Sequence, residues 1–180
     1  MNNMLSIIVC CRNEIRTIEE ILDRINKLSL IHPWKKEVVI VDNGSSDGTV
    51  EEIRKLYPNY KLICLPSNVG CEEGFNVGIV NSIGSILVFL DSDAFFEDDG
   101  INKIVHKFNN DPSLGIVDPR IFNFFSKKIQ NEPKNWPKHN RFTGCAVGLK
   151  KELFDNVGLR PKNYFIYASE EDVGIRALDY

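Results

Sequence analysis

Apolar residues in the first ninety positions fall into two patterns that alternate along the chain. Short continuous runs have the length of buried strands, and they occupy Leu5 to Cys10, Val38 to Val41, Lys61 to Leu65 and Ser85 to Leu90. Between these runs, apolar residues recur every three or four positions, as on one face of an amphipathic helix. The three sets are Ile15, Ile18, Ile21, Leu22, Ile25 and Leu28; Val50, Ile53 and Leu56; and Phe75, Ile79, Val80 and Ile83. This alternation predicts an α/β fold with right-handed βαβ crossovers, a mostly parallel sheet and helices on both faces.

The second half of the chain departs from this strict alternation. It predicts a helix over Ile101 to Phe108, short strands at Leu114 to Val117 and Arg120 to Phe125, a polar surface loop or flap at Lys127 to Arg141, a strand from Phe142 to Leu149 and a helix at Lys151 to Asn156. In the first half, Thr49 and Glu52 have the spacing of a capping box. The last residues read as helix without the glycine or proline expected at a helix end, so we expect a truncated C-terminus.

Composition limits the class of protein. A chain of 180 residues with 43% hydrophobic content is long enough for one domain. Its 22 basic and 25 acidic residues give a formal charge of −3 without a basic stripe, which argues against nucleic-acid binding. No apolar run approaches the roughly 18 residues of a spanning helix. The five cysteines form no C-x-x-C pair, and Cys10 and Cys64 lie in apolar runs typical of buried thiols, which indicates a cytoplasmic protein.

The last apolar run of the first half ends in two carboxylates, Asp91 and Asp93, with Ser92 between them. Ligands of open α/β sheets bind at the carboxyl ends of the strands. Hard cations such as Mg²⁺ are held there by one or two carboxylates together with the phosphates of a substrate. The pair therefore suits a divalent cation bound to a nucleotide diphosphate. Asp and Ser side chains are also common caps at helix starts, so the pair alone does not decide between the two roles.

Polar turns follow the second and third predicted strands. Asp42 begins a turn rich in Gly, Ser and Asp, so its carboxylate could accept hydrogen bonds from a nucleobase or ribose, or stabilise the turn itself. The segment from Asn68 to Gly70, with Gly74 and Asn76 beyond it, brings small residues to a helix start. Backbone can approach an anionic ligand closely there, although helix packing explains the same glycines and no P-loop lysine is present.

An acidic cluster, Glu170-Glu171-Asp172, stands near the end of the chain. Because successive helical residues turn by about 100°, Glu170 and Asp172 would point about 200° apart and could not both face one substrate. Asp172 and Arg176 have the i,i+4 spacing of an ion pair. This spacing favours a structural role for Asp172 and makes Glu170 the candidate general base. A solvated acidic first turn, favoured by the helix dipole, would have the same composition.

Taken in chain order, these segments resemble the family-two glycosyltransferases. The matching segments are Ser6–Glu14, Val41–Thr49, Asn68–Gly70, Leu90–Asp93, Phe142–Gly144 and Phe165–Arg176, so the resemblance covers nearly the whole chain. It implies a GT-A fold and an inverting transfer of a sugar from a nucleotide-diphosphate donor to an acceptor hydroxyl, in surface polysaccharide or glycan synthesis. Residues 1–180 would form one domain, with a nucleotide-sugar-binding half at 1–97 and an acceptor-side half at 98–180.

The resemblance also implies roles for individual residues. We expect the donor nucleotide to contact Cys11, Arg12, Glu14, Asp42, Asn68, Gly70, Asn76, Asp91 and Ser92. A divalent cation, Mg²⁺ or Mn²⁺, would be bound by Asp91 and Asp93, with Asp93 as the direct ligand. Counting back from Arg176 places Glu170 at the catalytic Asp of the family, whereas a shift by one residue would make Asp172 the base.

The implied partners are a nucleotide-diphosphate sugar, with UDP or dTDP favoured over GDP, and a glycan or lipid-linked acceptor. A cytoplasmic location at the inner face of a membrane is compatible with such an acceptor. Two other readings stay open. An apolar strand ending in Asp-x-Asp also resembles the nucleophile motif of haloacid dehalogenase-type phosphohydrolases, with Asp91 as nucleophile. The chain could also bind a nucleotide sugar without turning it over.

Overall fold

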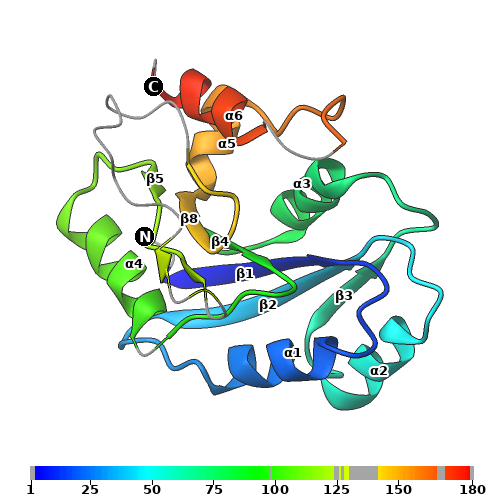
Figure 1. Cartoon of the computed structure of the whole chain (residues 1–180). Helices are drawn as coiled ribbons and strands as arrows, with labels where there is room; N and C mark the ends of the chain where they lie inside the picture. Colours follow the sequence, from blue (N-terminus) through cyan, green and yellow to red (C-terminus); the bar gives the residue numbers. More distant parts are fainter. Residues whose placement is uncertain are drawn as a thin grey trace.

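The computed structural model describes residues 3–97, 99–123, 126, 128–129, 142–165 and 169–178. Its centre is a six-stranded sheet in the order β3-β2-β1-β4-β8-β5 (Figure 1). The strands are β1 (Met4–Cys11), β2 (Lys35–Asp42), β3 (Lys61–Cys64), β4 (Ile86–Asp91), β5 (Ile116–Val117) and β8 (Val147–Lys150). The first four strands are parallel, and β8 runs antiparallel to both β4 and β5. The predicted mostly parallel sheet is therefore confirmed. A separate two-stranded sheet pairs β6 (Phe122–Asn123) with β7 (Lys128–Ile129).

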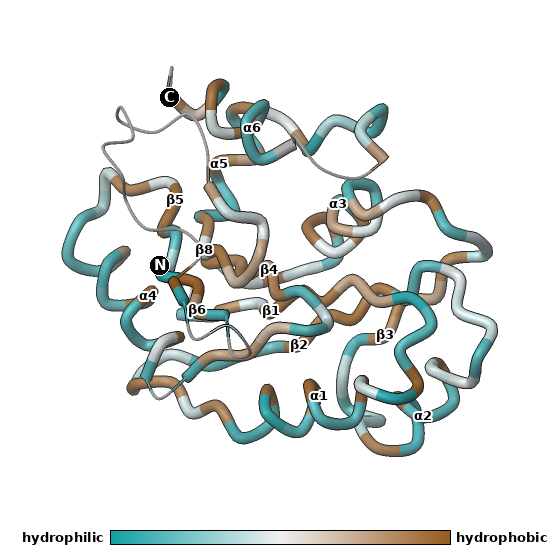
Figure 2. The backbone as a smooth tube through the Cα atoms, in the orientation of Figure 1, coloured by the Kyte–Doolittle hydropathy of each residue, from teal (hydrophilic) through white to brown (hydrophobic). Residues whose placement is uncertain are grey.

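Helices cover both faces of the central sheet (Figure 1). One face carries α1 (Ile18–Lys27), α2 (Thr49–Leu56) and α4 (Gly100–Asn110), and the other carries α3 (Cys71–Asn81), α5 (Lys151–Val157) and α6 (Ser169–Leu178). Successive strand residues point to opposite faces, so Ile7 and Val9 of β1 join one apolar core and Ile8 joins the other. Figure 2 shows the central strands as mainly apolar and the outer helices as largely hydrophilic. No helix among the described residues has the length and apolar character needed to span a bilayer.

Several local predictions need correction. The capping box is wrong, because α2 follows Gly48 in a left-handed conformation, and the Thr49 hydroxyl donates to Asp47 and accepts a bond from the Glu14 N–H. Ile15 and Ile83 were expected on buried helix faces, yet they are exposed because α1 begins at Ile18 and α3 ends at Asn81. Val80 lies within α3 but is exposed, because the buried face of that helix carries Phe75 and Ile79. Cys64 is exposed on the edge strand β3. Most of the predicted flap at 127–141 lies outside the described residues.

The close approach of α3 to β1 yields a test of the packing. A Cβ at Gly78 would overlap the Cγ2 methyl of Ile8, which is fully buried and cannot move aside. Overpacking costs about 1–3 kcal/mol, and alanine regains about 1 kcal/mol of helix propensity. We expect Gly78→Ala to lower the free energy of unfolding by roughly 1 kcal/mol, measured by urea denaturation. Gly115→Ala is the control, because a Cβ there meets Leu153 at an ordinary 3.6 Å; an equal loss in both variants would contradict this account.

Candidate functional site

The carboxyl ends of three adjacent strands bring together the polar residues that the sequence singles out. Cys11 at the end of β1 pairs in register with Asp42 at the end of β2, and Cys10 pairs with Asp91 at the end of β4. Strands β2 and β4 flank β1 in the sheet, so the three strand ends are adjacent. This edge is where open α/β sheets bind ligands. The segments 6–14, 41–49 and 90–93 therefore meet at one edge of the sheet.

The loops that follow β1 and β2 are joined by side-chain hydrogen bonds. The Asn13 N–H donates to the Ser45 hydroxyl at 2.8 Å, and the Ser46 N–H donates to Asn13 Oδ1 at 2.9 Å. Asn13 adopts a φ of 57°, a left-handed conformation that asparagine tolerates better than most residues. Glu14 reaches the end of β4, where its carboxylate accepts a hydrogen bond from the Ser92 hydroxyl at 3.0 Å. Glu14 and Ser92 therefore lie together, while the neighbouring Arg12 is exposed.

Asp42 is buried, with 1% of its surface exposed. Its Oδ2 accepts the Ser45 N–H at 3.0 Å, but its Oδ1 has no hydrogen-bond partner among the described residues. Buried polar atoms without a partner are uncommon and carry a free-energy cost. An oxygen in this position is ready to accept a bond from a ligand N–H or O–H.

Asn43, which sequence reasoning missed, attaches the third loop to this edge. Its Oδ1 accepts the Val69 N–H at 2.9 Å, and its Nδ2 donates to the Gly70 carbonyl at 3.0 Å. Asn68 is exposed, and its side chain accepts the Gly70 N–H at 3.0 Å. Gly70 has a φ of 90° and lies so close to Phe165 that a side chain would clash. The segment 68–70 thus lies beside Asp42, as the motif order predicts.

Asn76 has partners within the protein. Its side chain accepts the Arg160 N–H at 3.0 Å and donates to the Arg160 carbonyl at 2.9 Å and to Glu73 at 3.0 Å. It is 2% exposed. In this structure Asn76 holds the Arg160 segment against α3, and its predicted contact with a nucleotide stays a prediction.

Asp91 and Asp93 form the acidic centre of the edge. Burial raises the pKa of Asp91 above its ordinary value, and the Asp93 carboxylate raises it further. Cys145 hydrogen-bonds Asp91, and burial raises the pKa of that thiol to about 12, with Asp91 adding to the rise. A carboxylate whose ionised form is disfavoured by burial and by a neighbouring carboxylate fits an oxygen-preferring divalent cation, which would relieve that repulsion.

The described residues contain no group of three or more His, Cys, Asp or Glu side chains that could bind a metal ion on its own. The two aspartates would therefore need ligands from a substrate. This is the usual situation for Mg²⁺ at a nucleotide diphosphate, where phosphate oxygens and water complete the coordination shell.

Helix α6 brings Glu170 to the same place. The charge of Glu170 contributes to the raised pKa of Asp91, while the nearby Arg160 acts in the opposite direction. The Glu170 Oε1 accepts a charged hydrogen bond from Arg160 Nη2 at 3.2 Å, and a Cβ at Gly144 would overlap that same oxygen. Sequence position alone did not show that Gly144 and Glu170 lie in contact.

Asp172 has a different environment on the same helix. Its Oδ2 accepts bonds from Arg176 Nε at 2.8 Å and Nη2 at 2.5 Å, so the predicted i,i+4 pair is confirmed. Arg176 also donates to the backbone carbonyls of Gly158 and Leu159 at 3.0 Å each. Asp172 therefore stabilises, through Arg176, the turn that precedes Arg160, and Glu170 is the residue whose charge acts on Asp91.

Arg160 is the main residue of the site that the sequence analysis missed. The sequence feature that could have indicated a buried cation is in α3, where Glu72 lies on the same buried helical stripe as Phe75, Asn76 and Ile79. A charged residue on a buried stripe requires a partner. Glu72 is 2% exposed and pairs with Arg160, which is 3% exposed.

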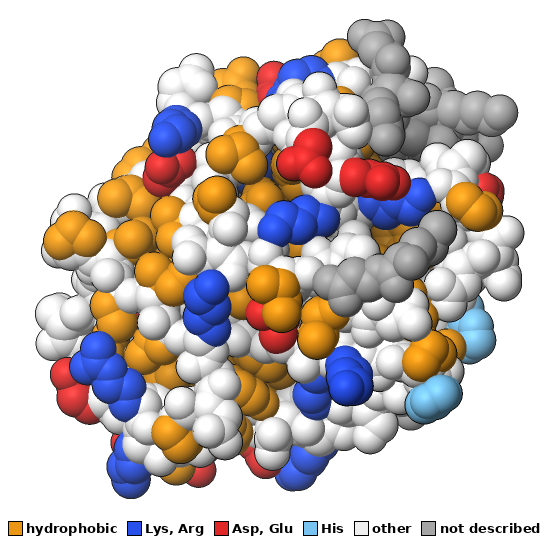
Figure 3. All heavy atoms as spheres, turned by 180° about the vertical axis from the view of Figure 1, so that it is seen from behind, with side chains coloured by type: hydrophobic (Ala, Val, Ile, Leu, Met, Phe, Trp, Pro, Cys, Tyr) orange, Lys and Arg blue, Asp and Glu red, His pale blue; other side chains and the backbone are white. Residues whose placement is uncertain are grey.

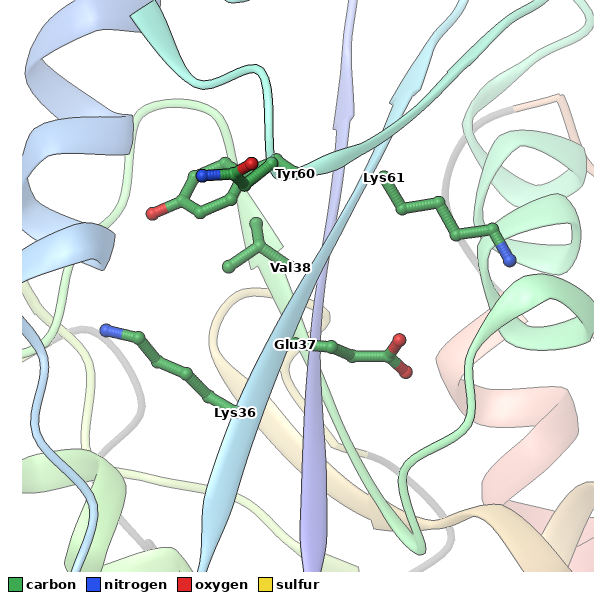
Figure 4. Close-up of a pocket in the computed structure, with 6 residues that line it drawn as sticks. Lys36, Glu37, Val38, Tyr60 and Lys61 are labelled. Carbon is green, nitrogen blue, oxygen red and sulfur yellow. The ribbon is translucent and has the colours of Figure 1, made fainter.

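A hollow of about 280 Å³ lies at the opposite, amino end of the strands, between Lys36, Glu37, Val38, Asn59, Tyr60 and Lys61 (Figure 4). Lys36 and Lys61 point to different sides of the sheet there. Their ammonium groups donate to backbone carbonyls of Ile25 and Asn81 at 2.7 and 2.6 Å.

Seen from behind, the molecule carries acidic and basic side chains interspersed with apolar ones (Figure 3). Neither the hollow nor this mixed surface is a better candidate for the functional site than the carboxyl edge of the sheet.

Comparison with known proteins places these features in one family. Residues 6–164 match the family model described as glycosyl transferase family 2. The poly-beta-1,6-N-acetyl-D-glucosamine synthase of Staphylococcus epidermidis is 34% identical over 123 residues, which are 66% of this chain and 29% of that protein. The chain therefore matches less than a third of the length of this relative.

Two solved structures show the same fold. The crystal structure of S. aureus TarS 1–349 superposes with a TM-score of 0.80 at 18% identity, covering 96% of this chain and 54% of that one. The mannosyltransferase PcManGT from Pyrobaculum calidifontis, in complex with GDP-Man and Mn²⁺, gives a TM-score of 0.73 at 27% identity, covering 94% and 50%. The expected GT-A fold is confirmed.

A hydrogen bond within the loop after β2 predicts a pH dependence. The Thr49 hydroxyl donates to Asp47 Oδ1 at 2.5 Å, and this bond holds the pKa of Asp47 below its ordinary 3.8. A carboxylate with a lowered folded-state pKa stabilises the fold above its unfolded pKa, and this contribution is lost as the pH falls through the folded value. We expect an NMR titration of the Asp47 carboxyl carbon to have its midpoint below 3.8, moving upward in Thr49→Val and staying low in Thr49→Ser. A midpoint unchanged by Thr49→Val would contradict the assigned cause.

Proposed function

The chain belongs to glycosyl transferase family 2, and we propose that it transfers a sugar, with inversion, from a nucleoside-diphosphate donor to an acceptor hydroxyl at the carboxyl edge of its sheet. One observation carries the proposal: Glu170 of α6 pairs with Arg160, whose guanidinium lies over Phe89 of β4, and the charge of Glu170 acts on Asp91 at the end of that strand. A general base and a site for a charged leaving group are then adjacent. General-base help alone is worth about 10²–10⁴-fold in rate.

The donor nucleotide is proposed to bind over β1 and β2. The free Oδ1 of buried Asp42 would accept a hydrogen bond from the base or the ribose. The exposed Asn68 and the backbone around Gly70 border the same space, because Asn43 ties that loop to the end of β2. On this proposal Glu14 positions Ser92, whose hydroxyl donates to the Glu14 carboxylate. Cys11 would contact the nucleotide through its backbone at the end of β1.

Asp91 and Asp93 are proposed to hold a divalent cation, with Asp93, the more exposed of the two, as the direct ligand. When bound, the cation supplies positive charge to the departing diphosphate. The oxygen-only donor set suits both Mg²⁺ and Mn²⁺. PcManGT, a relative of the same fold, is solved with Mn²⁺, which supports this choice of ion.

The proposed chemical step is a single displacement. The acceptor oxygen forms a bond to the anomeric carbon while the bond from that carbon to the diphosphate oxygen breaks. The electron pair of the broken bond leaves with the nucleoside diphosphate, and the hydroxyl proton passes to the Glu170 carboxylate. Attack opposite the leaving group inverts the anomeric configuration. Glu170 is favoured over Asp172 as the base because the charge of Glu170 acts on Asp91, whereas Asp172 is bound to Arg176, which also holds the turn at Gly158 and Leu159.

The names of the relatives narrow the proposed donor. The Staphylococcus epidermidis relative is a synthase of an N-acetylglucosamine polymer, which favours a UDP-linked N-acetylhexosamine and a glycan acceptor. PcManGT is solved with GDP-Man, so GDP sugars are the alternative donors to compare with UDP sugars. We propose that the protein acts in polysaccharide synthesis at the inner face of a membrane. The phosphohydrolase reading lacks support, because the family match covers both the Asp-x-Asp segment and the preceding βαβ units.

The donor site can be tested by calorimetric titration with UDP, dTDP and GDP, each with and without Mn²⁺. We expect binding of UDP that requires Mn²⁺, and Asp93→Ala should weaken it by at least about tenfold because a metal ligand is removed. Glu97→Ala is the matched control, since it removes another exposed carboxylate from the same loop. Binding of no nucleotide under any condition would contradict the proposed donor site.

The base can be tested by turnover of UDP-N-acetylglucosamine with Mn²⁺. We expect Glu170→Gln to keep the affinity for UDP and to lower turnover by about 10²–10⁴-fold, because the proton acceptor is lost. Glu171→Gln, the adjacent carboxylate on the exposed side of α6, should have little effect. Full activity in Glu170→Gln together with loss in Asp172→Asn would move the base to Asp172. Absence of turnover in the unmodified chain would instead favour a domain that binds the donor without transferring it.

A further inference from the structure

We propose that Arg160 is a positioning residue for Glu170, and that its buried ion pair with Glu72 directs the Glu170 carboxylate toward the reacting groups. This inference rests on the proposed function, in which Glu170 is the base. Arg160 is expected to touch neither donor nor acceptor, because only 3% of its surface is exposed. Its effect on the reaction would pass through Glu170.

The backbone and the side chain of Arg160 are both held in place. Asn76 binds the Arg160 N–H at 3.0 Å and its carbonyl at 2.9 Å, so a buried amide of α3 fixes the residue. The guanidinium lies over the rings of Phe75 and Phe89, 5.0 and 5.2 Å from their centroids. These contacts join Arg160 to α3 and to the central strand β4.

The guanidinium binds two carboxylates through different nitrogens. Its Nε donates to Glu72, and its Nη2 donates to Glu170 at 3.2 Å. The planar fork of arginine fixes the angle between two such partners, whereas a lysine ammonium is a point charge without that preference. Glu72 is 2% exposed and cannot turn away into solvent. The direction of Nη2, and with it the place of the Glu170 carboxylate, is therefore set by a buried contact.

Gly144 bounds the same carboxylate on another side. A Cβ at this position would overlap Glu170 Oε1, so the absence of a side chain makes room for the carboxylate where it is. Arg160 and Gly144 together restrict the position of the Glu170 carboxylate. Holding a base in reacting geometry before substrate arrives removes an entropy cost from the barrier, and a displacement of about 1 Å can cost about 10²-fold in rate.

The first test is a double-mutant cycle on hydrolysis of UDP-N-acetylglucosamine in Mn²⁺ without acceptor, where water replaces the acceptor hydroxyl. Arg160→Lys keeps the charge and should fold, and we expect it to lower kcat by about tenfold or more while UDP affinity stays within about twofold. In a Glu170→Gln background the same substitution should change kcat by less than about twofold, because residues that act as a unit are not additive. An equal loss in both backgrounds would overturn the positioning role.

The second test moves Glu170 without touching Arg160. Gly144→Ala inserts a methyl group against the carboxylate, and we expect it to lower kcat with little change in UDP affinity or in Tm. Gly115→Ala is the matched control, since its Cβ has ordinary contact distance, and it should retain full kcat. Unchanged kcat in Gly144→Ala would count against the restricted carboxylate.

A structural measurement separates this inference from the proposed function. Crystal structures of the unmodified protein and of Arg160→Lys should show the Glu170 carboxylate displaced from Gly144 in the variant. An unmoved carboxylate would overturn the positioning role whatever the chain catalyses. Full activity in Glu170→Gln would refute the base assignment even if Arg160→Lys displaced the carboxylate, so the two failures are distinguishable.

Discussion

Burial of the central strands on both faces is the constraint on which the rest of the structure depends. Ile7, Ile8 and Val9 of β1 have no exposed surface, and neither do the neighbouring residues of β4. A strand in this position has no room for functional polar side chains along its length, because unpaired polar groups are costly in an apolar core. Chemistry is therefore confined to the strand ends. Asp42 and Asp91 each stand at the last residue of their strand.

The two halves of the site depend on different kinds of contact. The loops after β1, β2 and β4 are connected by short polar side chains such as Asn13, Asn43 and Ser92, which bind one another or backbone at the rim of the sheet. The segment from Arg160 to α6 is instead held by a buried charged network through Glu72. Breaking a buried ion pair by removing one partner is strongly destabilising. The position of α6 is thus linked to the stability of α3.

The sequence predicted the parts of this protein whose signal is local. Strand lengths, helix periodicity and residues at strand ends led to the right sheet and to the clustering of Asp42, Asp91 and Asp93. Boundaries failed where tertiary contacts override local preference, as with Thr49, whose hydroxyl binds Glu14 and Asp47 from outside its helix. Arg160 and Gly144 could not be linked to Glu170, because those contacts depend on how α5 and α6 return to the sheet. Glu72 alone carried a readable signal, a charge on an apolar stripe.

The start of α3 has a consequence for how charge is balanced at this edge. The first N–H of that helix, from Cys71, already donates to the Phe165 carbonyl at 2.9 Å, so part of its positive potential is used within the protein. The buried cation Arg160 is shared between two glutamates. A polyanionic ligand would therefore meet mainly negative charge at the ends of β2 and β4. If such a ligand binds together with a divalent cation, as proposed, occupancy of the edge would follow the free concentration of that cation as well as that of the ligand.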